Sequence, residues 1–204
     1  MKKALFSIFM ILLYFSEVRS QERPTEEKYR KIWSYILDTN KLEFNMPENF
    51  STIIMKDCNY GIWDCKNGQK YAFQHVLINS DSTIAVGIRI DFNYTWANSK
   101  GEAMSTNVDW LQNAEDLYKF RVDLKKEYQD LDNQLLKRHW NAAYGMKFSR
   151  RRCDTPFIKD YSNHKSVVIA NKDIQILFDY FYNNEFNSKV DGVIDSTITM
   201  LRKK

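Results

Sequence analysis

The strongest constraint on the fold of this chain is a strictly alternating run near its middle. Every second residue of this run is apolar, which gives the set Ile84, Val86, Ile88, Ile90 and Phe92. Because successive side chains of a β-strand point to opposite faces, the run predicts a strand with one buried face. Burying each of these side chains stabilises the fold by about 1.5–3 kcal/mol, as an upper bound.

Residues 69–79 also have the composition of a strand, and residues 79–82, Asn-Ser-Asp-Ser, form turns readily. Together with the run 84–92 they predict an antiparallel hairpin. We expect the first strand to have two apolar faces, formed by Tyr71, Phe73 and Leu77 on one side and by Val76 and Ile78 on the other. Because a lone hairpin is marginal in water, the rest of the chain must supply more strands and a covering layer.

The other periodic segments complete an α+β pattern. Helical spacing predicts helices at 26–36, 110–140 and 188–201, with a break at 120–123 as the alternative for the second. Alternation or β-rich composition predicts strands at 42–46, 50–55, 146–148, 166–170 and 174–182. Residues 58–68 and 93–106 read as irregular connections, and Thr106 with Asp109 has the spacing of a capping box. Hairpins joined by helices favour an antiparallel β-sheet covered by helices, in a sandwich-like α+β fold.

The first twenty residues have the composition of a secretory signal peptide. Lys2 and Lys3 precede an apolar run from Ala4 to Phe15, and small residues precede Gln21. The run is too short for a membrane span, which needs about 20 apolar residues. An uncleaved anchor or a buried strand is the alternative. We therefore expect a signal peptide at 1–20, a single domain at 21–204, a secreted or periplasmic location and no stable membrane span after cleavage.

Cleavage after Ser20 changes the charge of the chain. It leaves 204 − 20 = 184 residues and removes three basic residues and one acidic residue, so the net charge falls from +4 to +2. A nucleic-acid-binding protein needs a concentrated basic face, so a nucleic-acid partner is not expected. Aromatic residues make up 15% of the chain, which favours a packed globule over a disordered segment.

One stretch resembles a known family. Residues 42–50, Leu-Glu-Phe-Asn-Met-Pro-Glu-Asn-Phe, form a strand that ends in proline before a second strand. This stretch, the central hairpin, the late strands and the closing helix resemble PsbP-like and DcrB-like domains over residues 41–204. The chain also resembles uncharacterised exported proteins of gut-type bacteria. The resemblance implies a sheet-and-helix sandwich that serves as a binding or assembly module, and fold likeness alone does not fix function.

No motif of catalysis or metal binding is found in the sequence. It contains no glycine-rich phosphate loop, nucleophile elbow or HExxH helix. His75, His139 and His164 lie far apart and lack the spacing of zinc ligands, so we expect no metal and no cofactor. His75 is instead expected to be a partnered residue of a strand. The carboxylates of the 110–140 segment alternate with lysines, which is typical of a solvated face, although folding could still bring an acid and a base together.

Two segments are candidate binding surfaces. The basic run Arg150, Arg151 and Arg152 could contact an acidic or phosphate-bearing partner, with a solvated basic turn as the alternative. Tyr180 and Tyr182 lie in a run of aromatic residues beside asparagines that could stack on sugars, with a place in the core as the alternative.

These features favour an exported protein that binds a protein or glycan of the cell envelope without catalysis. A cell-envelope hydrolase whose site is assembled only in the fold is the first alternative. An immunity or inhibitor protein with a charged face matched to a toxin is the second. An enzyme needs a deep pocket with converging polar groups of perturbed pKa, whereas a binding module needs only a groove or a patch.

The cysteines give a direct chemical prediction. Cys58 and Cys65 flank residues that turn readily, so this pair is expected to form a disulfide that stabilises by about 2–3 kcal/mol. The sequence alone leaves three pairings possible. Cys153 follows three arginines and is expected to stay free, and a reactive thiol whose thiolate these arginines favour is the functional alternative. Peptide mapping under non-reducing conditions should give a Cys58–Cys65 peptide. A peptide that joins Cys153 to either partner would contradict both expectations.

Overall fold

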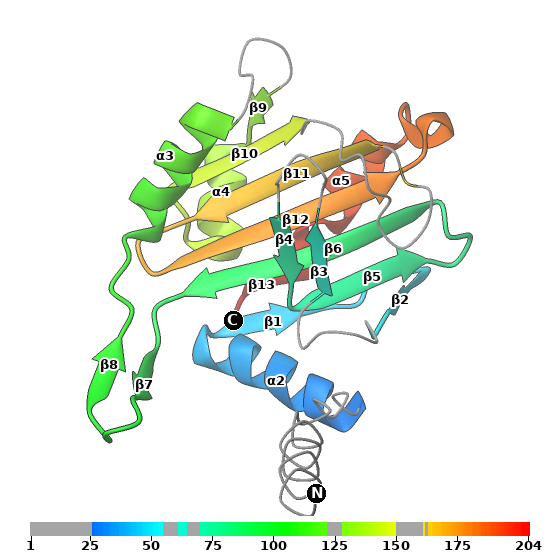
Figure 1. Cartoon of the computed structure of the whole chain (residues 1–204). Helices are drawn as coiled ribbons and strands as arrows, with labels where there is room; N and C mark the ends of the chain where they lie inside the picture. The colour runs from blue at the N-terminus through cyan, green and yellow to red at the C-terminus, as the bar shows by residue number, and fades with distance from the viewer. Residues whose placement is uncertain (1–25, 55–60, 65–69, 122–127, 150–160, 162) are drawn as a thin grey trace, which may run out of the picture.

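Seven antiparallel strands form one sheet at the centre of the computed structural model, which describes residues 26–54, 61–64, 70–121, 128–149, 161 and 163–204 (Figure 1). In spatial order the strands are β2 (Phe50–Thr52), β5 (His75–Asn79), β6 (Ile84–Phe92), β12 (Ile174–Tyr182), β11 (Asn163–Ala170), β10 (Tyr144–Ser149) and β9 (Tyr128–Asp130). Helices cover this sheet, so the predicted α+β class is confirmed.

The two alternating runs of the sequence lie side by side as β6 and β12. Phe92 stands opposite Ile174, and the pairing continues in register over nine residues of each strand. Ile88 and Phe178, which face each other across the pair, are completely buried. The prediction that both runs belong to one antiparallel sheet is confirmed. The hairpin of β5 and β6 is also present, and the side-chain oxygen of Asn79 closes its turn by accepting from the backbone N–H of Ile84 at 2.9 Å.

One face of the sheet carries the largest apolar cluster, which we call the helix-side core. Its covering elements are α2 (Glu26–Thr39), α4 (Asn133–Trp140), α5 (Val190–Thr197), the 3-10 turn η2 (Ile198–Met200) and the two-stranded ladder of β1 (Leu42–Phe44) with β13 (Leu201–Lys203). Trp33 of α2, Trp140 of α4 and Ile194 of α5 all reach this core. The helix predicted from residue 26 is confirmed, and its stripe buries Trp33 and Ile36.

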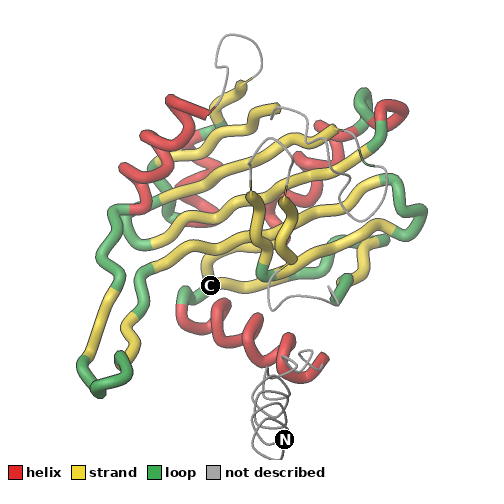
Figure 2. The backbone as a smooth tube through the Cα atoms, viewed as in Figure 1, coloured by secondary structure: helices red, strands yellow, loops and turns green. Residues whose placement is uncertain are grey.

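The opposite face carries two smaller apolar clusters. The hairpin of β3 (Gly61–Asp64) and β4 (Lys70–Phe73) crosses in front of β6 and β12, and α3 (Trp110–Arg121) packs on β10, β11 and β12 away from this hairpin (Figure 1). Phe73 packs with Phe181 in one cluster, and Ala114 of α3 packs with Leu177 in the other. A second hairpin, β7 (Thr95–Ala97) with β8 (Ala103–Ser105), extends away from the sheet (Figure 2), and the 3-10 turn η1 (Asn184–Phe186) follows β12.

The segment from Trp110 to Trp140 is not one helix, and the alternative of a break at 120–123 agrees with the end of α3 at Arg121. It forms α3, then the edge strand β9, and then α4. Ala114 packs on one face of the sheet and Leu136 on the other, so the chain crosses the sheet edge between them. The apolar spacing fits both helices, but β9 pairs with β10 and turns the chain to the opposite face.

The strand predicted at residues 69–79 is divided at Gln74. Phe73 lies on one face of the sheet and Leu77 on the other, so the expected shared face is wrong. At this point the Gln74 side chain forms the hydrogen bonds with β6 that a strand backbone would otherwise form. Its amide nitrogen donates to the carbonyl of Ile90 at 3.0 Å, and its oxygen accepts from the Ile90 N–H at 2.8 Å.

Three smaller expectations also change. The closing helix ends at Thr197, and Leu201 continues into β13, which pairs with β1. The connection at 93–106 contains the β7–β8 hairpin rather than irregular loop alone. Asp109 caps α3 itself, because its side chain accepts from the N–H of Gln112 at 3.1 Å. Thr106 instead accepts from the N–H of Tyr94 at 2.8 Å, so the two residues form no capping box.

The buried His75 joins α2 to the sheet. Its ring stacks on Trp33 with centroids 4.4 Å apart and on Tyr29 with centroids 5.7 Å apart. Nδ1 lies 2.7 Å from the Tyr29 hydroxyl, and Nε2 lies 3.3 Å from the Thr52 hydroxyl. Burial lowers the pKa of His75 to about 4 and raises the pKa of Tyr29, so both groups are neutral at pH 7. The prediction of a partnered strand histidine is confirmed.

Replacement of Gly87 in β6 should destabilise the protein. A Cβ at this position would lie 2.6 Å from Cδ1 of Phe73, whose buried ring packs edge-on against Phe181. We expect Gly87→Ala to cost about 1–3 kcal/mol by overpacking. Gly192 in α5 has open space around its Cβ position, so Gly192→Ala should stabilise by about 0.5–1 kcal/mol. Urea denaturation of both variants provides the measurement, and equal midpoints for Gly87→Ala and the unmodified protein would contradict the close contact.

Folding stability should also fall as the pH drops from about 6.5 to about 4. The unfolded chain protonates His75 near the ordinary histidine pKa of 6.5 and the folded protein only near 4, so the unfolded state binds more protons in this window. The full loss would be about 3 kcal/mol, as an upper bound. The pKa values of Asp191 and Asp81 lie below the ordinary aspartate value of 3.8, so the stability that these carboxylates contribute is lost only below that pH.

Urea denaturation at pH 7 and pH 4.5 measures this difference. His75→Gln should remove most of the pH dependence, because a neutral amide replaces the buried imidazole. His139→Gln, on the outer part of α4, is the matched control and should keep it. Equal pH dependence in the two variants would show that His75 is not responsible.

Candidate functional site

The predicted site residues fall into two groups. Cys58, Cys65, Cys153 and Arg150, Arg151 and Arg152 lie outside the described residues, so the disulfide, the reactive thiol and the basic patch stay predictions. Tyr180 and Tyr182 are described and lie in the helix-side core, exposed by 0% and 3%. They do not form a surface for stacking on sugars, because β12 is a central strand covered on this face by α5. The alternative reading of these aromatics, a place in the core, is the correct one.

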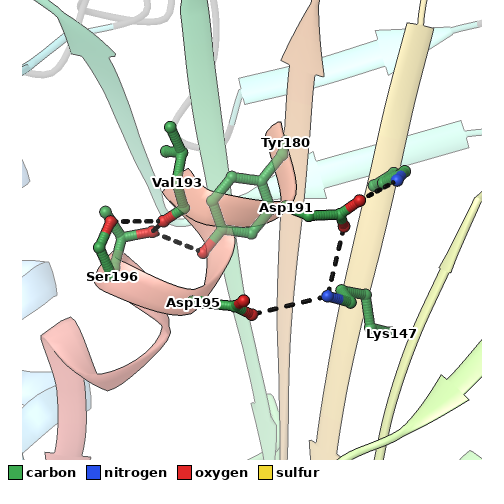
Figure 3. Close-up of polar contacts among 8 residues, drawn as sticks. Lys147, Tyr180, Asp191, Val193, Asp195 and Ser196 are labelled. Atoms are coloured by element: carbon green, nitrogen blue, oxygen red, sulfur yellow. Dashed lines mark hydrogen bonds and ion pairs between the residues drawn. The ribbon is translucent and has the colours of Figure 1, made fainter. Parts of the chain in front are cut away.

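A polar cluster lies between α5 and the outer strands (Figure 3). Lys165 of β11 binds one oxygen of Asp191 at 2.8 Å, and Lys147 of β10 lies 3.3 Å from the other and 3.5 Å from Asp195. Partial burial acts to raise the pKa of the Asp191 carboxyl, but the hydrogen bonds and charges of Lys165 and Lys147 outweigh it and hold this pKa below its usual range. Two lysines and two aspartates balance in charge.

A second polar contact, made by the buried Tyr180 hydroxyl, lies between β12 and α5. This hydroxyl lies 3.0 Å from the Thr197 hydroxyl, which donates to the carbonyl of Val193 at 2.7 Å (Figure 3). Complete burial raises the pKa of Tyr180, so it stays protonated. The ion pairs of Lys147 and Lys165 with Asp191 hold α5 on the outer strands, although the Asp191 oxygen that faces Lys147 has no hydrogen-bond partner.

The β7–β8 hairpin has the opposite character, because its apolar side chains are uncovered. We call residues 93–106 the arm. Three of the six large hydrophobic side chains that are exposed in the described residues lie on it, namely Tyr94 at 49%, Trp96 at 41% and Met104 at 44%. Tyr94 contacts Phe92 with ring centroids 5.9 Å apart and Trp96 with centroids 5.2 Å apart. Trp96 stands opposite Met104, so an aromatic and methionine face runs along the arm.

The backbone of the arm is fixed by its own hydrogen bonds. At the base, the Asn93 side chain donates to the carbonyl of Val108 and accepts from its N–H, both at 2.9 Å. At the tip, the Asn98 side-chain oxygen accepts from the N–H groups of Lys100 and Glu102. Gly101 has a φ of 79°, which glycine adopts without strain. These hydrogen bonds close the hairpin at its base and at its tip, although both strands are exposed along their length.

The sequence contained a signal for this arm that the reading as irregular loop missed. Phe92, Tyr94 and Trp96 continue the alternation of β6 beyond its last residue, and residues 98–101, Asn-Ser-Lys-Gly, form turns readily. Alternation followed by such a turn predicts a hairpin. What the alternation could not show is that the apolar face stays uncovered.

A cavity of about 230 Å³ opens at the end of the helix-side core. Its walls come from the end of α2, from β1 and β13, from α4 and from the turn between β11 and β12. Ile174 lines the cavity and stands opposite Phe92, where the aromatic run of the arm begins. The arm and the cavity therefore lie at the same end of the β6–β12 pair.

In the described part of the chain no group of three or more His, Cys, Asp or Glu side chains could hold a metal ion. No helix among residues 26–54, 70–121, 128–149 and 163–204 is both long enough and apolar enough to cross a membrane.

Comparison with known proteins adds one likeness. No family model matches the chain, and no curated protein matches it. The solution structure of cyanobacterial PsbP (CyanoP) from Synechocystis sp. PCC 6803 is similar over 81% of this chain and 88% of its own, with 11% identity and a TM-score of 0.42. CyanoP carries the name of the PsbP group that the sequence resembles, although a likeness at this TM-score and identity carries no inference about function.

Proposed function

We propose that this protein is a binding module that docks a partner protein through the arm. The observation that carries the proposal is the uncovered face of Tyr94, Trp96 and Met104 on a backbone whose shape is already fixed. None of these three side chains belongs to an apolar cluster of the sheet, although Tyr94 contacts Phe92 at the edge of the helix-side core.

The energetics favour association of this face with an apolar surface. Removal of apolar area from water gains about 25 cal/mol per Å². Tyr, Trp and Met are enriched at protein interfaces, and a few such residues carry most of the binding energy. Because the arm holds its shape before binding, little conformational entropy is lost on association.

The charge and the ring geometry of the arm favour a protein over a nucleic acid or a sugar chain as its partner. Its charged side chains are Lys100 and Glu102, which balance, so the arm does not attract a nucleic acid. The Phe92, Tyr94 and Trp96 rings tilt by 57° and 41° to their neighbours and so form no flat platform for a chain of sugars. An irregular face of this kind fits the apolar groove of a protein.

Binding without catalysis is supported by where the perturbed groups lie. Burial strongly perturbs the pKa values of Tyr29, His75 and Tyr180. None of them lines the cavity at the end of the helix-side core, and each is hydrogen-bonded to another side chain. This arrangement is typical of structural contacts rather than of a hydrolase site. With a signal peptide at residues 1–20, the partner is a protein of the cell envelope.

Site-specific photocrosslinking in the producing cell tests the proposal. A benzophenone side chain in place of Trp96 should give one discrete protein adduct in the envelope fraction. The same group in place of Tyr35, which is 62% exposed on α2, is the matched control and should not give this adduct. The adduct partner is then purified and titrated with the unmodified chain.

In that titration, Tyr94→Ala and Trp96→Ala should each weaken binding by about 2 kcal/mol or more, the size typical of interface hot spots. Tyr35→Ala should leave the affinity unchanged, and all three variants should keep the urea midpoint. Equal adducts at positions 35 and 96, or an arm variant of full affinity, would contradict docking through the arm. An adduct with a glycan instead of a protein would contradict the proposal that the partner is a protein.

A further inference from the structure

A second cavity, of about 340 Å³, opens between the outer strands β9, β10 and β11 and the start of α5, and we call it the outer-strand cavity. Its lining includes three charged side chains, two amides and a serine hydroxyl, namely Lys147, Lys165, Asp191, Gln129, Asn187 and Ser149. The volume falls within the range of about 300–1,000 Å³ that is usual for small-molecule sites.

The strand register places four of these polar side chains on one face of the sheet. Gln129 stands opposite Lys147, and Ser149 stands opposite Lys165. Lys147 and Ser149 are two residues apart, so they point to the same side of β10. Lys165 also stands opposite Tyr180, a member of the helix-side core. The helix side of the sheet therefore changes from apolar to polar at the outer strands, and this polar row forms the floor of the cavity.

The two lysines of the floor keep unused hydrogen-bond donors. Each ammonium group carries three N–H donors. Among the contacts of the described residues, Lys165 binds only Asp191, at 2.8 Å. Lys147 contacts only Asp191 and Asp195, at 3.3 Å and 3.5 Å (Figure 3). At least two N–H groups of Lys165 and one of Lys147 are therefore available to an oxygen atom in the cavity.

The charges around the cavity favour a neutral ligand. The two lysines and two aspartates of the cluster balance, so a ligand of either net charge gains little from it. A hydroxyl group both donates and accepts, so it can bind a lysine ammonium and also the carboxylate of Asp191, whose side chain is 48% exposed. Gln129 and Asn187 are exposed at the edge of the cavity and add amide donors and acceptors.

We propose that the outer-strand cavity binds a neutral sugar ring through its hydroxyl groups. The hydroxyls accept from the ammonium groups of Lys147 and Lys165 and donate to the carboxylate of Asp191. The ring takes the place of the water that a polar cavity of this size holds. Lys165 stands opposite Tyr180, and Tyr180 stands opposite Val86, at the end of β6 away from the arm. The test of this site is therefore independent of docking through the arm.

Titration of the full ¹⁵N-labelled chain with glucose, galactose, mannose and N-acetylglucosamine tests the proposal. The backbone amide resonance of Asn187 reports from the edge of the cavity. We expect a saturable shift with at least one of these sugars and none with cyclohexanol, which has a six-membered ring and a single hydroxyl. Glucuronate and glucosamine, which carry a negative and a positive charge, should bind no more tightly than the best neutral sugar.

Variants then locate the binding. Ser149→Leu places a larger side chain on the floor and should abolish the shift, whereas Ser51→Leu on β2, at the other edge of the sheet, is the matched control and should keep it. Lys165→Met removes the ammonium group and should weaken binding by about 10-fold or more, as expected for a lost hydrogen bond to a charged group. Lys204→Met also removes a lysine that is paired with an aspartate, and it should keep full affinity.

Each outcome decides the proposal. No saturable shift with any neutral sugar would show that the cavity holds water only and would overturn it. Tighter binding of glucuronate or glucosamine than of every neutral sugar would overturn the neutral ligand. Equal affinity of the Ser149→Leu and Ser51→Leu variants would place the sugar outside this cavity. If Ser149→Leu does not fold, the comparison of Lys165→Met with Lys204→Met decides the question, since neither lysine belongs to an apolar cluster.

Discussion

The pairing of β6 with β12 is the contact on which the rest of the structure depends. Its nine in-register residue pairs present Ile88 and Phe178 to the helix-side core and Ala85 and Phe181 to the opposite face. A strand buried on both faces is unusual in an antiparallel sheet, and here it requires cover on each side. The helices and the β1–β13 ladder supply one cover, and α3 with the β3–β4 hairpin supplies the other (Figure 1).

The same pair also decides where the two candidate sites lie. β6 continues past its last paired residue, Phe92, into the arm, and β12 begins opposite it at Ile174, which lines the cavity at the end of the helix-side core. The end of a central pair is where backbone groups leave the ladder and side chains lose their cross-strand neighbours. At this end the side chains of Tyr94 and Trp96 stay exposed. At the far end of the sheet, beside the outer-strand cavity, the charges of Lys147, Lys165, Asp191 and Asp195 are matched.

Short-range patterns in the sequence predicted the elements that are determined by neighbouring residues of the chain. The alternation of Ile84–Phe92 and Ile174–Tyr182 identified both central strands, because a period of two has no other regular explanation. The stripe from Trp110 to Trp140 misled because helical spacing does not record which face of a sheet a helix covers. The strand is divided at Gln74, whose side chain forms hydrogen bonds with the backbone of Ile90, sixteen residues later in the sequence. A periodic pattern of apolar residues contains no signal for such a contact. The cavity at the end of the helix-side core likewise arises from segments that meet only in the fold, so its lining could not be predicted from the sequence.

The proposed role of the arm separates the residues that stabilise the fold from those that bind a partner. The other large rings of the helix side, such as Trp33 and Trp140, are buried, and each stabilises the core into which it packs. Trp96 is as large, yet it lies on a hairpin whose hydrogen bonds come from Asn93 and Asn98 and do not depend on it. A hairpin alone is marginal in water, and exposure of apolar area adds no stability to the folded monomer. The free energy that this face can contribute is therefore realised only when another surface covers it.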